Sequence, residues 1–352
     1  MKKLIIRADG NSQIGTGHFM RCLSLAQYWK NEVGEVYFIM IPNQVLEERI
    51  KNENMNFIPM HEVPGSMEDV LKLVKVNKEL NGNWIVLDGY HFSSDYQKVI
   101  KDNQINLLFI DDDGKLNHYY SDIILNQNLH GEELQYLNKE NYTKLLLGTD
   151  YVLLREEFFK YLNYKKEIKE VKNILVTLGG SDINNFTLKV VKSIFNLNNF
   201  NNSMFDYDNL HIKVIIGSNN PNKSLIEKYL TENNVLNIEI IQNSLNMADL
   251  MFWADLVFSS GGTTVWEIAF MGIPGIISGI AENQFSSIKK LNQMSLFKTI
   301  NCIKNIDENE ISKMIIDIIL DKNIRQKMSM LQQSLINGKG CESVVNEILS
   351  FK

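Results

Sequence analysis

Residues 4–29 read LIIRADGNSQIGTGHFMRCLSLAQYW. The run Leu4–Ala8, which is apolar except for Arg7, predicts a buried strand, and the residues Phe19–Trp29 place apolar side chains at helical spacing. Between them, the glycines of IGTG at 14–17 let the backbone bend sharply and come close to a ligand. A strand, a glycine turn and a helix in this order predict one unit of a parallel α/β sheet.

The same alternation of apolar runs and helical patterns continues through both halves of the chain. The candidate strands are KLIIRAD, EVYFIMI, NWIVLDGY, INLLFIDDD and DIILNQN in the first half, and NILVTLGG, HIKVIIGS, NIEIIQN, DLVFSSGG and PGIISGI in the second. Runs so continuous in Ile, Val and Leu are typical of parallel strands that are covered on both faces. We therefore expect an α/β protein with two doubly wound, Rossmann-like domains that face each other across a cleft.

The length of 352 residues favours two domains. The charged segment 156–172 precedes a fresh strand and marks the expected boundary. We predict an N-terminal α/β domain over 1–160 that carries the catalytic loop, a C-terminal nucleotide-binding α/β domain over 171–335, and a C-terminal helix over 336–352. An asparagine-rich stretch at 196–210 predicts a surface loop.

Composition excludes several classes of protein. The formal net charge of -6 argues against a general nucleic-acid surface, but one locally positive pocket can still bind an anion. Cys22, Cys302 and Cys341 lie far apart and form no CxxC pair, which argues against a disulfide framework or a zinc site. No run approaches the roughly 18 apolar residues of a membrane span. We expect a cytoplasmic protein, without a nucleic-acid partner, for which a monomer is compatible with the sequence.

A histidine follows the first glycine turn directly. His18 comes after Gly15, Thr16 and Gly17 at the mouth of the expected helix. A helix N-terminus offers unpaired N–H groups and a partial positive charge, which favour a phosphate or a developing anion. Histidine titrates near neutral pH, so it can accept a proton from water. The alternative is a tight turn whose histidine only hydrogen-bonds the nearby backbone, because GTGH is neither GxGxxG nor a Walker loop.

Two glycine turns end strands in the second half. One turn contains Gly179, Gly180, Ser181 and Asp182, and the other contains Gly261, Gly262, Thr263 and Thr264. Turns of this kind can hold a diphosphate with their N–H groups, and threonine hydroxyls add donors. Glu267 follows one helical turn later and is placed to accept hydrogen bonds from ribose hydroxyls. Each turn alone could be a simple strand-to-helix connection, but together with GTGH they predict a nucleotide-sugar site.

The chain resembles the UDP-sugar hydrolases of pseudaminic acid biosynthesis. These enzymes act on UDP-2,4-diacetamido-2,4,6-trideoxy-β-L-altropyranose and are similar to two-domain GT-B glycosyltransferases, including the enzyme that forms lipid II. The resemblance covers most of the chain and rests on the order and spacing of short motifs. They are RADGNSQIGTGHFMRCLSLA at 7–26, LDGYHF at 87–92, IDDDG at 110–114, ILNQN at 124–128, YVLLREEF at 151–158, TLGGSD at 177–182, SSGGTTVWE at 259–267 and ENQ at 282–284.

This resemblance implies a function for each motif. It implies that His18 is the general base that activates water for attack at the anomeric carbon, and that Tyr90 and Asn283 line the sugar site. It further implies that the GGSD and GGTTVWE segments hold UDP. The other substrate contacts that it implies are Asp88, Arg155 and Gln284. UDP is already a good leaving group, so one histidine base suffices and the carboxylate pair of ordinary glycosidases is not required.

Three alternatives stay open at this point. Asp111 and Asp113 form a D-x-D pattern, which holds a divalent metal in other sugar-transfer enzymes, although an acidic turn can instead hydrogen-bond locally. We expect no metal and no cofactor, because the glycine turns already serve the diphosphate. A GT-B glycosyltransferase would use the same UDP site and pass the sugar to an acceptor. A non-catalytic nucleotide-sugar-binding protein would keep the fold alone.

Overall fold

The structure is a computed structural model that describes residues 1–11, 15–168, 170–180, 182–200, 206–217, 220–242, 244 and 246–351, with only the backbone of Asn283. Three predicted features lie wholly or partly outside the described residues: Ser181, the side chain of Asn283, and the middle of the asparagine-rich stretch. The chain divides into two compact units, 1–156 together with 338–352, and 157–337.

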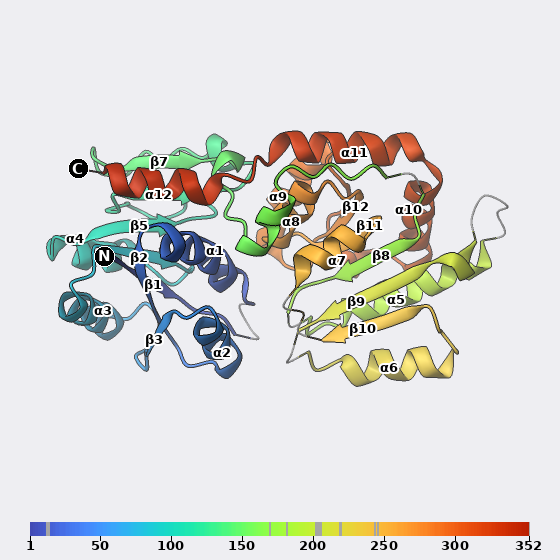
Figure 1. Ribbon diagram of the computed structural model, residues 1–352, viewed down its shortest axis with the longest axis horizontal. Coiled ribbons are helices and arrows are strands. Elements are labelled where there is room, and N and C mark those ends of the chain that lie inside the picture. Colours follow the sequence, from blue (N-terminus) through green and yellow to red (C-terminus); the bar gives the residue numbers. More distant parts are fainter. Residues whose placement is uncertain are drawn as a thin grey trace. The chain divides into compact units, whose positions relative to one another are not determined.

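The first unit is a parallel sheet with the strand order β3-β2-β1-β4-β5-β6-β7 (Figure 1). Its strands are β1 (Lys2–Ala8), β2 (Gly34–Met40), β3 (Asn56–Pro59), β4 (Trp84–Asp88), β5 (Asn106–Ile110), β6 (Ile123–Asn126) and β7 (Lys144–Leu147). Its helices are α1 (Gly17–Glu32), α2 (Gln44–Asn52), α3 (Met67–Leu80), α4 (Ser94–Asp102) and α12 (Gly340–Ser350).

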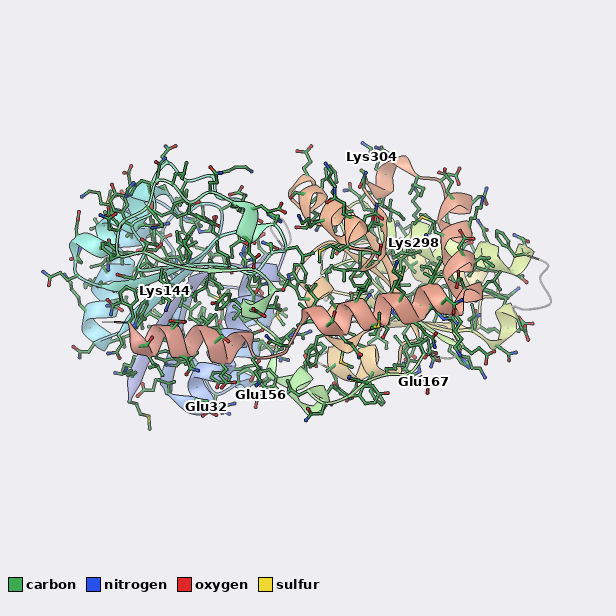
Figure 2. All side chains as sticks on the ribbon, turned by 90° about the horizontal axis from the view of Figure 1, so that it is seen from above. Glu32, Lys144, Glu156, Glu167, Lys298 and Lys304 are labelled. Atoms are coloured by element: carbon green, nitrogen blue, oxygen red, sulfur yellow. The ribbon has the colours of Figure 1, made fainter. Side chains whose placement is uncertain are left out.

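Helices cover both faces of this sheet. Leu4 and Ile6 of β1 face a core built with α1, α2 and α12, whereas Ile5 faces the core built with α3 and α4. This alternation along one strand explains why β1 is apolar at successive positions. The helix over the last residues, expected as a separate element, packs on the first unit: Lys144 of β7 pairs with Glu347 of α12, and Figure 2 shows Lys144 beside that helix.

The second unit is a parallel sheet with the strand order β10-β9-β8-β11-β12-β13. Its strands are β8 (Asn173–Thr177), β9 (His211–Ile216), β10 (Ile238–Gln242), β11 (Leu256–Ser260), β12 (Gly275–Ser278) and β13 (Lys298–Ile300). Its helices are α5 (Phe186–Phe195), α6 (Lys223–Glu232), α7 (Met247–Trp253), α8 (Thr264–Met271), α9 (Phe285–Gln293), α10 (Glu308–Leu320) and α11 (Lys322–Leu335). Apolar side chains of α5, α6 and α10 share one core with the strands.

Both sheets have a topological switch point, where the direction of winding reverses. In the first unit it lies between β1 and β4, and in the second between β8 and β11. Ligands of open α/β sheets bind beyond the carboxyl ends of the strands at such points. The residues that follow β1, β4, β8 and β11 are therefore the candidates for ligand binding. Among the described residues, no helix has the length and apolar character needed to cross a bilayer.

Candidate active site

The switch point of the first unit brings a histidine and an aspartate together. His18 is the second residue of α1, and Asp88 is the last residue of β4. Nδ1 of His18 lies 2.7 Å from Oδ1 of Asp88. Because an ionised carboxylate only accepts hydrogen bonds, this contact assigns the proton to Nδ1 and leaves the lone pair on Nε2. The side chain of His18 is 10% exposed. This is the arrangement of a general base whose tautomer is fixed by a carboxylate.

Asp88 has a second partner on α1. Arg21 donates from Nε to Oδ2 at 2.5 Å and from Nη2 to Oδ1 at 2.6 Å. The Asp88 side chain is completely buried. Burial opposes ionisation of this carboxyl group, but the charges of Arg21 and His18 outweigh it and lower the pKa of Asp88 below its ordinary value. Asp88 therefore stays ionised and keeps accepting the Nδ1 proton of His18.

Arg21 also binds a second carboxylate, Asp112, which follows β5. Nη1 lies 2.7 Å from Oδ1 of Asp112, and Nη2 lies 3.0 Å from Oδ2. Asn128 donates to Oδ1 of Asp112 at 2.8 Å. Burial opposes ionisation here too, but the charge of Arg21 holds the pKa of Asp112 well below its usual range. The sequence prediction did not include Arg21, Asp112 or Asn128 as site residues.

Tyr90, which the resemblance places at the sugar site, lies next to His18. Its ring meets the His18 ring edge to face, with 4.8 Å between the centroids. Its hydroxyl donates to Oδ2 of Asp112 at 3.1 Å, and its side chain is 59% exposed. An exposed aromatic ring that is anchored at both ends suits a contact with a sugar.

The three consecutive aspartates after β5 have three different sets of partners. Asp111 accepts hydrogen bonds from Tyr119 and Tyr136 at 3.1 and 2.8 Å and from the Gly114 N–H at 2.9 Å. Asp113 pairs with Lys115 at 2.7 Å. The two ends of the D-x-D pattern are therefore engaged separately, and only the middle residue, Asp112, contacts the residues around His18. In the described part of the chain, no group of three or more His, Cys, Asp or Glu side chains could hold a metal ion.

The turn before His18 is anchored by a buried arginine in β1. Arg7 lies 2.7 Å from Asp9 and binds both oxygens of Asp69 at 3.0 Å. At the other end of the turn, Gly15 has a φ of 76°, a left-handed conformation that favours glycine. Thr16 precedes α1, and its side chain makes no capping hydrogen bond. The residues at 12–14 lie outside the described part of the chain.

The two glycine turns of the second unit lie close together, because β8 and β11 are neighbours. A Cβ atom added to Gly179 would lie 4.0 Å from Oγ of Ser260, the last residue of β11. Gly262 begins the approach to α8, and a Cβ added there would meet nothing within 4 Å. The main chain of this turn therefore borders open space, as an anion-binding turn requires.

Asp182 and Gln284 are engaged within the protein. The carboxylate of Asp182 accepts the N–H groups of Phe186 and Thr187 at 2.8 and 2.7 Å, so it caps α5. The substrate contact expected of Asp182 stays a prediction. Gln284 accepts the Ile280 N–H at 3.1 Å, which shapes the loop beside the glycine turn.

The remaining predicted residues have these positions. Thr263 and Thr264 begin α8, with the Thr263 side chain making no capping hydrogen bond, and Glu267 lies in the first turn of that helix. Gly180 packs its carbonyl against Gly217. Arg155 is buried and lies near the end of residues 1–156, the first of the two segments that form the first unit.

We expect Glu267→Ala to weaken UDP binding about 10-fold or more, because a hydrogen bond to a charged group contributes about 1.5–3 kcal/mol. Calorimetric titration with UDP measures this change, and thermal unfolding should be little altered. Glu232→Ala, at an exposed position of α6, is the matched control. Native affinity in the Glu267 variant would exclude the contact with ribose.

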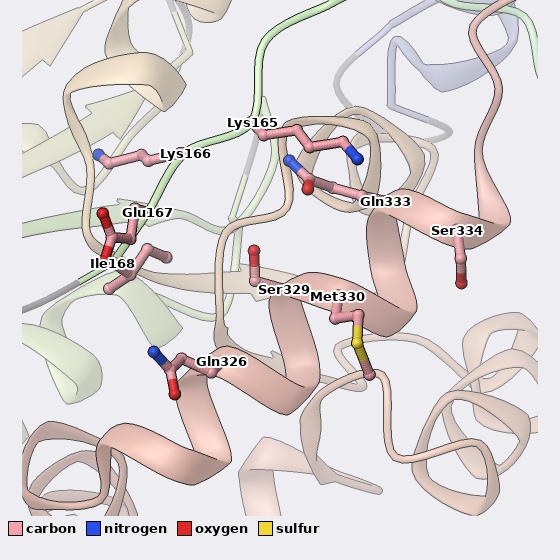
Figure 3. A pocket seen from close by; sticks show the side chains of 9 residues that line it. All are labelled: Lys165, Lys166, Glu167, Ile168, Gln326, Ser329, Met330, Gln333 and Ser334. Atoms are coloured by element: carbon pink, nitrogen blue, oxygen red, sulfur yellow. The ribbon is translucent and has the colours of Figure 1, made fainter.

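A separate pocket of about 370 Å³ lies in the second unit (Figure 3). It is lined by Lys165, Lys166, Glu167, Ile168, Gln326, Ser329, Met330, Gln333 and Ser334. Nζ of Lys166 donates to the carbonyls of Phe252 and Ala254, which precede β11. The pocket therefore lies at the amino ends of the strands, away from the glycine turns.

Residues 173–343 match the glycosyltransferase family 28 C-terminal domain. The matched region lies mostly within the second unit and contains both glycine turns described above. The solved structure of MurG from Acinetobacter baumannii has the same fold, with a TM-score of 0.66 at 12% identity over 99% of both chains. A spinosyn rhamnosyltransferase solved with thymidine diphosphate gives a TM-score of 0.66 at 10% identity, over 99% of this chain and 100% of the other. The expected GT-B architecture of two Rossmann-like domains is confirmed.

Curated relatives confirm the family resemblance drawn from the motifs. The UDP-2,4-diacetamido-2,4,6-trideoxy-β-L-altropyranose hydrolase of Campylobacter jejuni is 28% identical over 267 residues, which is 75% of this chain and 87% of that protein. A spore coat polysaccharide biosynthesis protein of Bacillus subtilis is 24% identical over 95% of this chain and 94% of its own. An uncharacterized protein of Methanocaldococcus jannaschii is 31% identical over 78% of this chain, which spans only 55% of that relative.

Proposed function

We propose that this protein hydrolyses a UDP-linked 2,4-diacetamido-2,4,6-trideoxy sugar to the free sugar and UDP, as a step of pseudaminic acid biosynthesis. The observation that carries the proposal is the contact of 2.7 Å between Nδ1 of His18 and Asp88, which leaves Nε2 as a proton acceptor. The name of the Campylobacter jejuni relative supports the substrate class. The glycine turns of the second unit support a diphosphate ligand.

The proposed reaction is a single displacement. Nε2 of His18 takes a proton from water while the water oxygen forms a bond to the anomeric carbon. The bond between that carbon and the UDP oxygen breaks, and UDP leaves with the electron pair. Asp88 stabilises the imidazolium that forms, and N–H groups of the glycine turns stabilise the departing diphosphate. One displacement inverts the anomeric configuration.

A second candidate is sugar transfer to an acceptor. The family 28 domain and the MurG-like fold favour it, because a glycosyltransferase would use the same UDP site. In that case His18 would deprotonate an acceptor hydroxyl in place of water. The two reactions differ only in the nucleophile, so a direct assay distinguishes them.

The deciding experiment is incubation of the protein with UDP-sugars and no acceptor, in water labelled with oxygen-18. Hydrolysis at the anomeric carbon releases UDP and places the label in the free sugar. UDP release that requires an added acceptor would identify a transferase. UDP-sugar binding without turnover would identify a non-catalytic binding protein. Label in the phosphate of UDP would contradict attack at carbon.

We expect hydrolysis to continue in EDTA at almost its full rate. The reason is that Asp111 and Asp113 are engaged by tyrosines and Lys115, while the proposed diphosphate site consists of N–H donors. The measurement is UDP release before and after chelation, followed by addition of magnesium or manganese. Activity that is lost in EDTA and restored by either ion would assign a metal to the reaction.

A further inference from the structure

On the side of the ring that faces away from Nε2, His18 lies beside three charged side chains, those of Arg21, Asp88 and Asp112. Arg21 follows His18 by one helical turn on α1 and is 4% exposed. It lies between Asp88 at the end of β4 and Asp112 after β5, with all four carboxylate oxygens within 3.0 Å of its nitrogens. The fixed charges beside the ring are thus two negative and one positive.

We propose that Arg21 and Asp112 are positioning residues that together set the charge state of His18 and keep its ring in the base-competent form. Arg21 shares the Asp88 carboxylate with the ring, because its Nη2 and the Nδ1 of His18 approach the same oxygen at 2.6 and 2.7 Å. Asp112 holds the other edge of the guanidinium. This inference rests on the proposed role of His18 as the base.

The geometry gives the two residues opposite effects. Nη2 of Arg21 lies 3.2 Å from Nδ1 of His18, so its positive charge disfavours an imidazolium. The charge of Asp112 favours an imidazolium and also fixes Arg21 in its bidentate position. With both present, the local fixed charge is −1. It becomes −2 without Arg21, 0 without Asp112, and −1 again without both.

The other titratable groups around the ring are not substituted in any variant, although Tyr90 donates its hydroxyl to Oδ2 of Asp112. The Sγ of Cys22 lies 3.5 Å from Asp88, and burial followed by the charge of Asp88 raises the pKa of this thiol, so it stays neutral. Burial and Arg7 lower the pKa of His91, which follows Tyr90 in the chain. His130 contacts the Asp112 backbone carbonyl through Nε2 at 3.0 Å. Differences between the variants therefore come from Arg21 and Asp112.

The test is an NMR titration of the His18 ring in full-length protein labelled at histidine, without substrate. For Asp112→Asn we expect the midpoint to move to lower pH, and for Arg21→Gln to higher pH, each by about one unit. Arg21→Lys and the double variant Arg21→Gln, Asp112→Asn should titrate close to the native protein. The acid limb of kcat/KM should move in the same order. Asp113→Asn, the neighbouring aspartate that pairs with Lys115, is the matched control and should not shift.

Two outcomes would overturn the proposal. Equal titration midpoints in all variants, or shifts of the same sign for Asp112→Asn and Arg21→Gln, would show that the contacts only support the fold. If Arg21→Gln does not fold, Asp112→Asn and the double variant decide the question. A titration midpoint of His18 that falls in Asp112→Asn and returns to the native value in the double variant supports the proposal. A midpoint that does not return to the native value contradicts it. Absence of hydrolysis in the native protein would instead refute the proposed function, while the NMR titration would still decide this inference.

Discussion

His18→Asn is expected to lower turnover by roughly 10²–10⁴, the usual contribution of a general base, while UDP binding stays almost unchanged. The substituted amide can still donate to Asp88, so the buried contacts of that carboxylate are largely kept. The glycine turns proposed to hold UDP belong to the second unit and are not altered. Steady-state UDP release measures the first effect, and calorimetric titration with UDP measures the second.

His61→Asn is the matched control, because the same substitution falls on an exposed histidine outside the site. It should keep native turnover. The native enzyme should also lose activity at acid pH as the base becomes protonated, and the His18 variant should lack this limb. Full hydrolytic turnover in His18→Asn would show that the histidine only shapes the turn, and the base would have to be sought at Tyr90 or Asp88.

Gly262→Asp is expected to weaken UDP binding by roughly 100-fold or more, because juxtaposed like charges cost several kcal/mol. A Cβ atom at this position would meet nothing within 4 Å, so the side chain begins in open space. Its carboxylate would occupy the space where the diphosphate is proposed to bind. Titration with UDP gives the loss of affinity, and thermal unfolding shows whether the fold is intact.

Gly262→Ala separates charge from size in this test. The alanine methyl group extends in the same direction as the aspartate side chain but carries no charge. UDP affinity should therefore remain much closer to the native value than in Gly262→Asp. Equal losses in both variants would indicate that the turn needs glycine for backbone approach alone. Native affinity in Gly262→Asp would place the diphosphate elsewhere.

The central strands of both sheets could be predicted because they are buried on both faces and therefore almost continuously apolar. Three strands were missed: β3, β7 and β13, which have four, four and three residues. Each lies at the edge of its sheet with one neighbour only. An edge strand buries less of its surface, so its apolar run is too short to distinguish from a loop.

The parts of the site that are marked by glycine turns and by the order of the motifs could be predicted from the sequence. The parts that depend on the direction in which a side chain points were harder to predict. The structure brings the predicted residues His18, Asp88 and Tyr90 together. Arg21 was missed because a polar residue inside a helical pattern looks like part of a solvated face, although its spacing of three residues from His18 places both on one side of α1. In IDDDG, only the folded backbone shows which of the aspartates points toward that side.

The ends of the two units also depend on packing that sequence patterns do not reveal. The sequence predicts a C-terminal helix over 336–352 without indicating what it contacts, and the structure buries Val344 and Ile348 in the core of the first unit. Gly340 permits this approach, because a Cβ atom there would lie 2.1 Å from the Val152 carbonyl oxygen. A close backbone contact between distant segments has no local sequence signature beyond the glycine itself.

Because α12 returns to the first unit, residues 157–337 are topologically a domain insertion. The contact between Gly340 and Val152 shows that the host segments approach each other near the two insertion points. A first unit expressed as 1–156 alone would leave unfilled the space occupied by the apolar side chains of α12, each of which stabilises a fold by about 1.5–3 kcal/mol when buried. The uninterrupted unit is the second one, so recombination could exchange it as a single continuous segment of the gene.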